Sequence, residues 1–179
     1  MTGFLTIWIG ILHLMFNCWA QSPTPTVIDR IEAVVEGKPI TLSDVELEKS
    51  LAKLSPSIFS PFEDRRKNPL QFLIEVQLLR HLAGEVPLYQ PNEQEIQKRT
   101  KIIYDQLETQ PMIYAYFMMK HAVTDARLAR VIKDVIIAEK YANRNLGKAA
   151  NESDDELLRR YEIWIYKIKA NSNFRYAEQ

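Results

Sequence analysis

One segment of the chain is apolar on two sides of a helix, and this feature constrains the fold more than any other. Asn68 suits an N-cap and Pro69 the first helical position, so a helix is predicted from Pro69 to about Ala83, before Gly84. Its two apolar stripes are Leu70, Leu73, Ile74 and Leu78, and Phe72, Val76, Leu79 and Ala83. A helix with two apolar stripes has to be covered on both sides. We therefore expect it at the centre of the fold, with other elements packed around it.

Further helices are predicted from cap residues and from apolar residues three or four positions apart. Ser43 stands three residues before Glu46, the spacing of a capping box, so the first helix is predicted to begin at Ser43. The same spacing recurs before the last helix, at Ser153 and Glu156. Between the central and the last helix, we expect helices at 91–109, 111–121 and 124–147. Two prolines and a charge cluster predict a loop at 55–66.

Short strands are predicted at the two ends of this helical region. Ile31, Ala33 and Val35 alternate with mostly charged residues, which is the period of a half-buried strand, and residues 36–39 have the composition of a turn. Residues 174–176 are a candidate closing strand. The predicted fold is therefore mainly α. It has a multi-helix core with a short N-terminal β-hairpin, and a C-terminal helix plus short strand that pack back on it.

The first twenty residues contain no Asp, Glu, Lys or Arg, whereas the whole chain is 26% charged. The apolar run from Phe4 to Phe16, followed by small residues at Cys18 and Ala20, predicts a signal peptide at 1–20 that is cleaved after Ala20. Two alternatives stay open. The segment is retained as an N-terminal membrane anchor, or a lipid is attached to Cys18.

The remaining residues are expected to form one domain. Residues 21–26 are rich in Pro and Thr and are predicted to be an extended leader. Residues 27–176 are predicted to be a single domain, which the helix and strand at 153–176 complete. Cys18 is the only cysteine of the sequence, so cleavage would leave a protein without thiols or disulfides.

Charge balance and the absence of reactive motifs indicate a protein that is not an enzyme. Lys+Arg and Asp+Glu are 23 each, and a neutral chain without a long basic run is a poor nucleic-acid binder. Beyond the predicted signal peptide the histidines are His81 and His121, in different predicted helices and without a nucleophile motif. The acidic run at 152–156 suits a helix N-terminus better than a metal. We expect no catalytic residue, metal, cofactor, nucleic acid or small-molecule substrate.

One segment, "PMIYAYFMMKHAV", is a candidate for peptide binding. It crowds methionines and aromatic residues more densely than one helix face needs, and such side chains suit surfaces that accept many apolar sequences. The candidate residues are Met112, Tyr114, Tyr116, Met118 and Met119. The competing interpretation is that the cluster is core. We expect a mixture, with Ile113 and Phe117 inward and some of Tyr114, Met118 and Met119 lining a cleft. The exposed edge of the strand at 31–35 is the alternative binding place.

Four phrases, in this order, resemble a known family. "DRIEAVVEGKPITLSDVE" resembles the opening of the SurA-type periplasmic chaperones and the related parvulin-like foldases, where a hairpin leads into the first helix. "PLQFLIEVQLLRHLA" resembles their central helix, and "RLARVIKDVIIAEKYANRNLG" a later long helix. "YEIWIYKIKANSNFRY" resembles the C-terminal helix and strand that return to the N-terminal region. The resemblance spans Val27 to Tyr176.

The resemblance implies a function and also a difference from the family. In those relatives parvulin-type isomerase modules lie between the long helix and the C-terminal helix, where this chain has only residues 147–153. Isomerase activity is therefore not expected. The family implies a periplasmic, ATP-independent holdase that binds unfolded outer-membrane or secreted polypeptides. The alternative from another class is a structural or assembly subunit that uses the same apolar surface to form a homodimer or to dock on an envelope complex.

Overall fold

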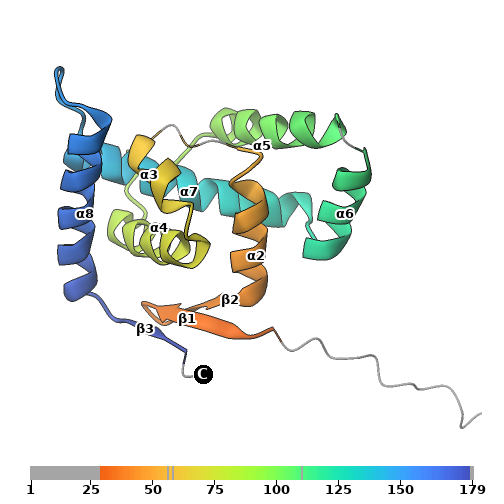
Figure 1. Ribbon diagram of the computed structural model, residues 1–179, viewed down its shortest axis with the longest axis horizontal. Helices are drawn as coiled ribbons and strands as arrows, with labels where there is room; N and C mark the ends of the chain where they lie inside the picture. Colours follow the sequence, from red (N-terminus) through yellow and green to blue (C-terminus); the bar gives the residue numbers. More distant parts are fainter. Residues whose placement is uncertain (1–28, 56, 58, 110, 178–179) are drawn as a thin grey trace, which may run out of the picture.

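The fold is mainly α with one small sheet, as expected, in a computed structural model that describes residues 29–177 apart from 56, 58 and 110. Figure 1 shows its elements. They are β1 (Ile31–Val35), β2 (Lys38–Thr41), α2 (Leu42–Leu51), α3 (Ser60–Arg65), α4 (Pro69–Ala83), α5 (Glu93–Glu108), α6 (Pro111–His121), α7 (Asp125–Leu146), α8 (Asp154–Ala170) and β3 (Phe174–Tyr176). The predicted signal peptide, its cleavage or lipid site and the leader at 21–26 lie outside the described residues. Among the described helices, none has the length and apolarity to span a bilayer.

Helix α4 lies at the centre, and its two apolar stripes enter two different clusters. Ile74 and Leu78 are buried against the sheet, in a cluster with Ala33, Val35 and Ile40. The opposite stripe packs against α3, α7 and α8 through Phe72, Val76 and Leu79. The prediction of a helix covered on both sides is therefore confirmed, and its bounds are those expected from Asn68, Pro69 and Gly84.

The three strands form an antiparallel sheet in the order β2-β1-β3. Glu36 and Gly37 connect β1 to β2 with φ of 48° and 76°, the left-handed conformation that two-residue hairpins need. The closing strand β3 pairs with β1. Because β1 is the central strand, the expectation that its edge is exposed is wrong. Ile31 is also exposed rather than inward, since the ladder shifts register between Ile31 and Ala33.

The outer edge of the sheet at β2 carries Pro39. Val35 and Lys38 flank the two-residue turn and so exchange hydrogen bonds, which leaves Pro39, opposite Val34, with its nitrogen facing outward. Proline has no N–H to donate, so this edge offers an incomplete ladder to any added strand.

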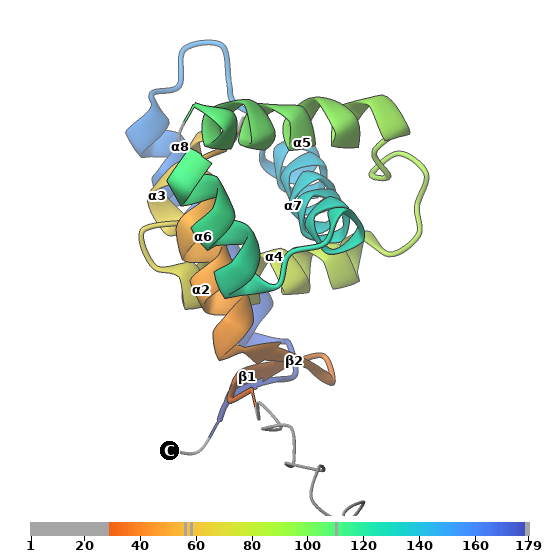
Figure 2. The same ribbon diagram turned by 90° about the vertical axis from the view of Figure 1, so that its right-hand side faces the viewer.

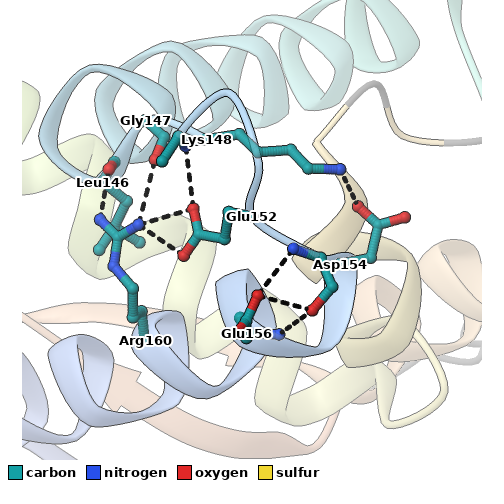
Figure 3. A network of polar contacts seen from close by, with 9 residues as sticks. Leu146, Gly147, Lys148, Glu152, Asp154, Glu156 and Arg160 are labelled. Carbon is teal, nitrogen blue, oxygen red and sulfur yellow. Dashed lines mark hydrogen bonds and ion pairs between the residues drawn. The ribbon is translucent and has the colours of Figure 1, made fainter.

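Helix α8 closes the fold by packing on α3, α4 and α7 (Figure 1). Tyr161 is fully buried there, with its ring edge-on to Phe59 at 5.8 Å and to Phe62 at 5.9 Å between centroids. The short joint before α8 is fixed by Arg160, which donates to the carbonyl oxygens of Leu146 at 2.6 Å and Gly147 at 3.3 Å. It also pairs with Glu152 at 2.7 Å, as Figure 3 shows. These bonds satisfy carbonyls that the end of α7 leaves free.

Helix α2 begins earlier than predicted. Its N-cap is Thr41, in a capping box with Asp44 in which the Asp44 N–H donates to Thr41 Oγ1 at 3.3 Å. The N–H of Ser43 donates instead to Asp29 Oδ1 at 3.1 Å. The prediction is therefore wrong: the N-cap is Thr41, two residues before Ser43, and the helix begins at Leu42. The physical reason is that β2 runs directly into the helix, so the end of the sheet fixes where the helix begins.

Helix α3 occupies part of the predicted loop at 55–66, which is a second correction. Pro61 stands in the first turn, where its missing N–H removes no helical hydrogen bond. Phe62 is fully buried and anchors this helix between α4 and α8. The proline that suggested a loop is thus compatible with a helix start.

Candidate peptide-binding surface on helix α6

Helix α6 lies at the end of the molecule opposite α8, with the long α7 running between the two (Figure 1). Figure 2 faces this end and shows α6 beside α2 and below α5, the two helices on which it packs. Phe117 is its buried anchor, 3% exposed, in a cluster with Leu47 of α2, Leu107 of α5 and Leu128 of α7. The predicted inward position of Phe117 is confirmed. The side chain of Ile113 lies outside the described residues.

The five predicted site residues divide into three groups. Met112, Tyr116 and Met119 are 88%, 56% and 78% exposed and stand at i, i+4 and i+7, so they share one face of α6. We call these three residues the α6 stripe. Tyr114 is 36% exposed and lies beside Tyr104, with ring centroids 6.4 Å apart. Met118 is half-buried and packs on the cluster around Phe117.

A hollow of about 500 Å³ adjoins the stripe between α2, α5 and α6, and we call it the α6 cleft. Leu54, Leu107 and Phe117 supply its apolar lining. Tyr116 is the one member of the stripe that lines it, so the prediction that Tyr114, Met118 or Met119 lines a cleft is not met here. The cleft therefore brings together residues of three helices, of which only Tyr116 was a sequence candidate.

Ser50 and His121 meet on the wall of the cleft. The Ser50 hydroxyl lies 3.0 Å from His121 Nε2 and 3.2 Å from the carbonyl oxygen of Glu46, to which it donates. A hydroxyl has one proton and the imidazole can carry its N–H on either ring nitrogen, so the tautomer of His121 decides which of the two groups donates. Burial lowers the pKa of His121, which is 5% exposed, and Lys120 adds to that shift. The pair therefore joins α2 to α6.

The rim of the α6 cleft is predominantly cationic. Lys120 pairs with Glu46 at 3.4 Å, and its ammonium lies 5.6 Å from the centroid of the Tyr116 ring. Lys49 and Lys53 are exposed on the rim, and within the described part of the chain neither forms an ion pair. Three ammonium groups thus face one carboxylate.

A second groove was not foreseen from the sequence. It has a volume of about 410 Å³ and lies between β2, α2, α4 and α7. Two ion pairs cross it, Arg80 to Asp134 at 2.5 Å and Arg127 to Asp44 at 3.3 Å. In the sequence, this groove corresponds to charged residues at 127, 130 and 134 on one face of α7. Such a row of charges by itself indicates a solvated helix surface. The ion pairs join the walls of this groove, so we consider the α6 cleft the better candidate for a polypeptide ligand.

Across 29–177, without 56, 58 and 110, no group of three or more His, Cys, Asp or Glu side chains is placed to hold a metal ion.

Comparisons of the chain with family models, with curated proteins and with solved structures found no match.

Proposed function

We propose that this protein is an exported, ATP-independent chaperone that holds unfolded outer-membrane or secreted polypeptides on the α6 stripe and in the α6 cleft. The observation that carries the proposal is the exposure of Met112 and Met119, 88% and 78%, on the same helix face as Tyr116. Side chains of this size and apolarity are normally removed from water, and an exposed group of them is characteristic of an interaction surface.

The stripe is not needed for the core. Helix α6 is anchored by Phe117, and Met118 adds to the same cluster from the flanking position. The three stripe residues lie on another face and touch solvent. Flexible thioethers beside a tyrosine adapt to clients of different shape, which is the property a holdase requires.

The order of elements supports the same proposal. A β-hairpin leads directly into α2, α4 is central, and the chain returns to β1 through α8 and β3. This is the arrangement that the resemblance to SurA-type chaperones implies, and the export signal predicted at 1–20 agrees with an envelope location. The joint between α7 and α8 spans residues 147–153, so no isomerase module is part of the proposal.

The test is a triple variant, Met112→Gln with Tyr116→Ser and Met119→Gln. Each substitution is at an exposed position, where changes in stability are typically below about 0.5 kcal/mol. We expect the wild-type protein to suppress light scattering by an unfolded β-barrel client, and the triple variant to lose most of that protection. Met118 is left unchanged because it is half-buried.

The matched control is Ile163→Gln with Tyr166→Ser on α8. These side chains are 54% and 73% exposed and lie at the other end of the molecule from α6. This variant should protect the client as wild type does. Equal protection by all three proteins would place binding elsewhere, and a homodimer that only the stripe substitutions dissociate would favour the assembly-subunit alternative.

A further inference from the structure

The charges around the α6 cleft favour one class of client segment over another. Lys49 lies in the last turn of α2 and Lys53 in the turn that follows the helix, and both line the α6 cleft. Lys120 reaches the rim from α6. Glu46 is the one carboxylate among the lining residues. The rim therefore attracts negative charge and repels positive charge.

The three ammonium groups are not equivalent. Lys120 is engaged by Glu46 at 3.4 Å and by the face of Tyr116, so part of its charge is already compensated within the protein. Lys49 and Lys53 are exposed and form no ion pair among the described residues. Their charge is available to a ligand that enters the cleft.

The hollow itself selects an apolar group. Tyr116 and the partly buried Leu54 form its apolar wall above the buried Leu107 and Phe117, and its volume of about 500 Å³ is enough for one or two large side chains. We propose that the α6 cleft binds segments of unfolded polypeptide in which an aromatic or aliphatic side chain is flanked by Asp or Glu. The apolar side chain enters the hollow and the flanking carboxylates meet Lys49 and Lys53. The inference rests on the proposed function and adds the class of sequence that the same site prefers.

An anionic membrane surface is the competing partner for lysines beside exposed methionines. A flat bilayer reaches protruding side chains, whereas the apolar lining of this cleft is recessed between three helices and the lysines surround the hollow. A peptide side chain can enter such a hollow and a lipid surface cannot. The geometry therefore favours the peptide.

The experiment uses three fluorescent peptides with the same central Leu-Phe-Tyr-Leu sequence and with flanks of Asp/Glu, Ser or Lys. Fluorescence anisotropy with the full protein should rank the affinities as acidic, then neutral, then basic. At low salt the acidic peptide should bind about three- to tenfold more tightly than the neutral one, and the difference should shrink in 0.5 M salt.

The charge-reversal variant Lys49→Glu with Lys53→Glu should reverse this ranking. Its matched control is Lys98→Glu with Lys167→Glu, which changes the net charge equally at two exposed lysines that do not line the cleft. The control should keep the wild-type ranking. A circular dichroism melt of both variants verifies that each is folded.

The outcomes separate this inference from the proposed function. Equal binding of the three peptides, or an acidic preference that survives Lys49→Glu with Lys53→Glu, overturns the flank preference and leaves the holdase standing. Binding of none of the peptides, together with no protection of a client, overturns both. Sedimentation with phosphatidylglycerol vesicles that depends on Lys49 and Lys53, without peptide binding, replaces the peptide by a membrane surface.

Discussion

His121 is the titratable side chain at the junction of α6 with α2. Its Nε2 lies 3.0 Å from Ser50, and Arg127 of α7 donates to its carbonyl oxygen at 2.7 Å. Burial lowers the pKa of the imidazole first, Lys120 and Arg127 lower it further, and Glu46 opposes them. The folded protein therefore favours the neutral ring, which fits its contact with Ser50.

This shift predicts an acid sensitivity of the folded state. An unfolded chain protonates His121 near the ordinary pKa of about 6.5, while the folded protein does so only at lower pH. The contribution of His121 to the free energy of unfolding is therefore complete above about pH 6.5 and decreases as the pH falls below that value. Urea midpoints at pH 7.5 and 5.5 should differ less for His121→Gln than for wild type. His81→Gln, at a more than half-exposed histidine, should retain the wild-type difference. An identical pH response of His121→Gln and wild type would contradict this account.

At the scale of the element, the start of α2 gives a sharp comparison. Thr41→Ala removes the hydroxyl that accepts from Asp44 N–H, so it should lower the free energy of unfolding by about 0.5–2 kcal/mol. Ser43→Ala removes no such cap, and its effect should be below about 0.5 kcal/mol. The denaturant midpoint should move with little change in m. A larger loss for Ser43→Ala than for Thr41→Ala would restore the start predicted from the sequence.

How far the elements follow from the sequence depends on how many local signals compete. At α4, Asn68, Pro69 and Gly84 mark the start and the end of one helix without a competing signal, and the predicted bounds match those of the structure. At α2, Thr41 with Asp44 and Ser43 with Glu46 offer overlapping capping boxes, and only the end of β2 decides between them. The end of β2 is fixed by tertiary contacts, so the local sequence alone does not show which of the two residues caps α2.

The candidate site shows the same limit. The sequence indicated a helix at 111–121 with surplus apolar residues, and α6 has those bounds. It did not indicate which of these residues are exposed to solvent. Met112 and Met119 are exposed and Met118 is half-buried because α2 and α5 cover one face of α6, and the position of those helices cannot be read from the segment itself. Lys49 and Lys53 were missed because they lie more than fifty residues from α6 in the chain.

At the scale of the whole molecule, one carboxylate links three helices. Glu75 of α4 is fully buried and pairs with Arg65 of α3 at 2.5 Å and with Lys169 of α8 at 2.6 Å. Tyr161 of α8 also donates to it, at 3.0 Å. The burial and the pair with Glu75 hold the pKa of Tyr161 well above its ordinary value. The network fixes the C-terminal helix to the centre of the fold.

Replacing Glu75 should therefore destabilise the whole protein. Glu75→Gln keeps the size of the side chain but leaves Arg65 and Lys169 facing a neutral amide in a buried site, so the free energy of unfolding should fall by about 3 kcal/mol or more. Asp105→Asn, in the exposed pair with Lys101, should leave the urea midpoint unchanged. If the two variants have the same midpoint, the buried network does not hold α8 in place.

Pro39, at the outer edge of the sheet, has a consequence for the proposed binding of aggregation-prone polypeptides. Unfolded β-barrel segments polymerise by adding strands to any open edge, and a chaperone with such an edge would seed the aggregates it is meant to prevent. Pro39 interrupts the donor row of β2, and β3, the opposite edge, is only three residues long. A chaperone of the proposed kind would then hold its clients through side chains of the α6 stripe and the α6 cleft, without adding their strands to its own sheet.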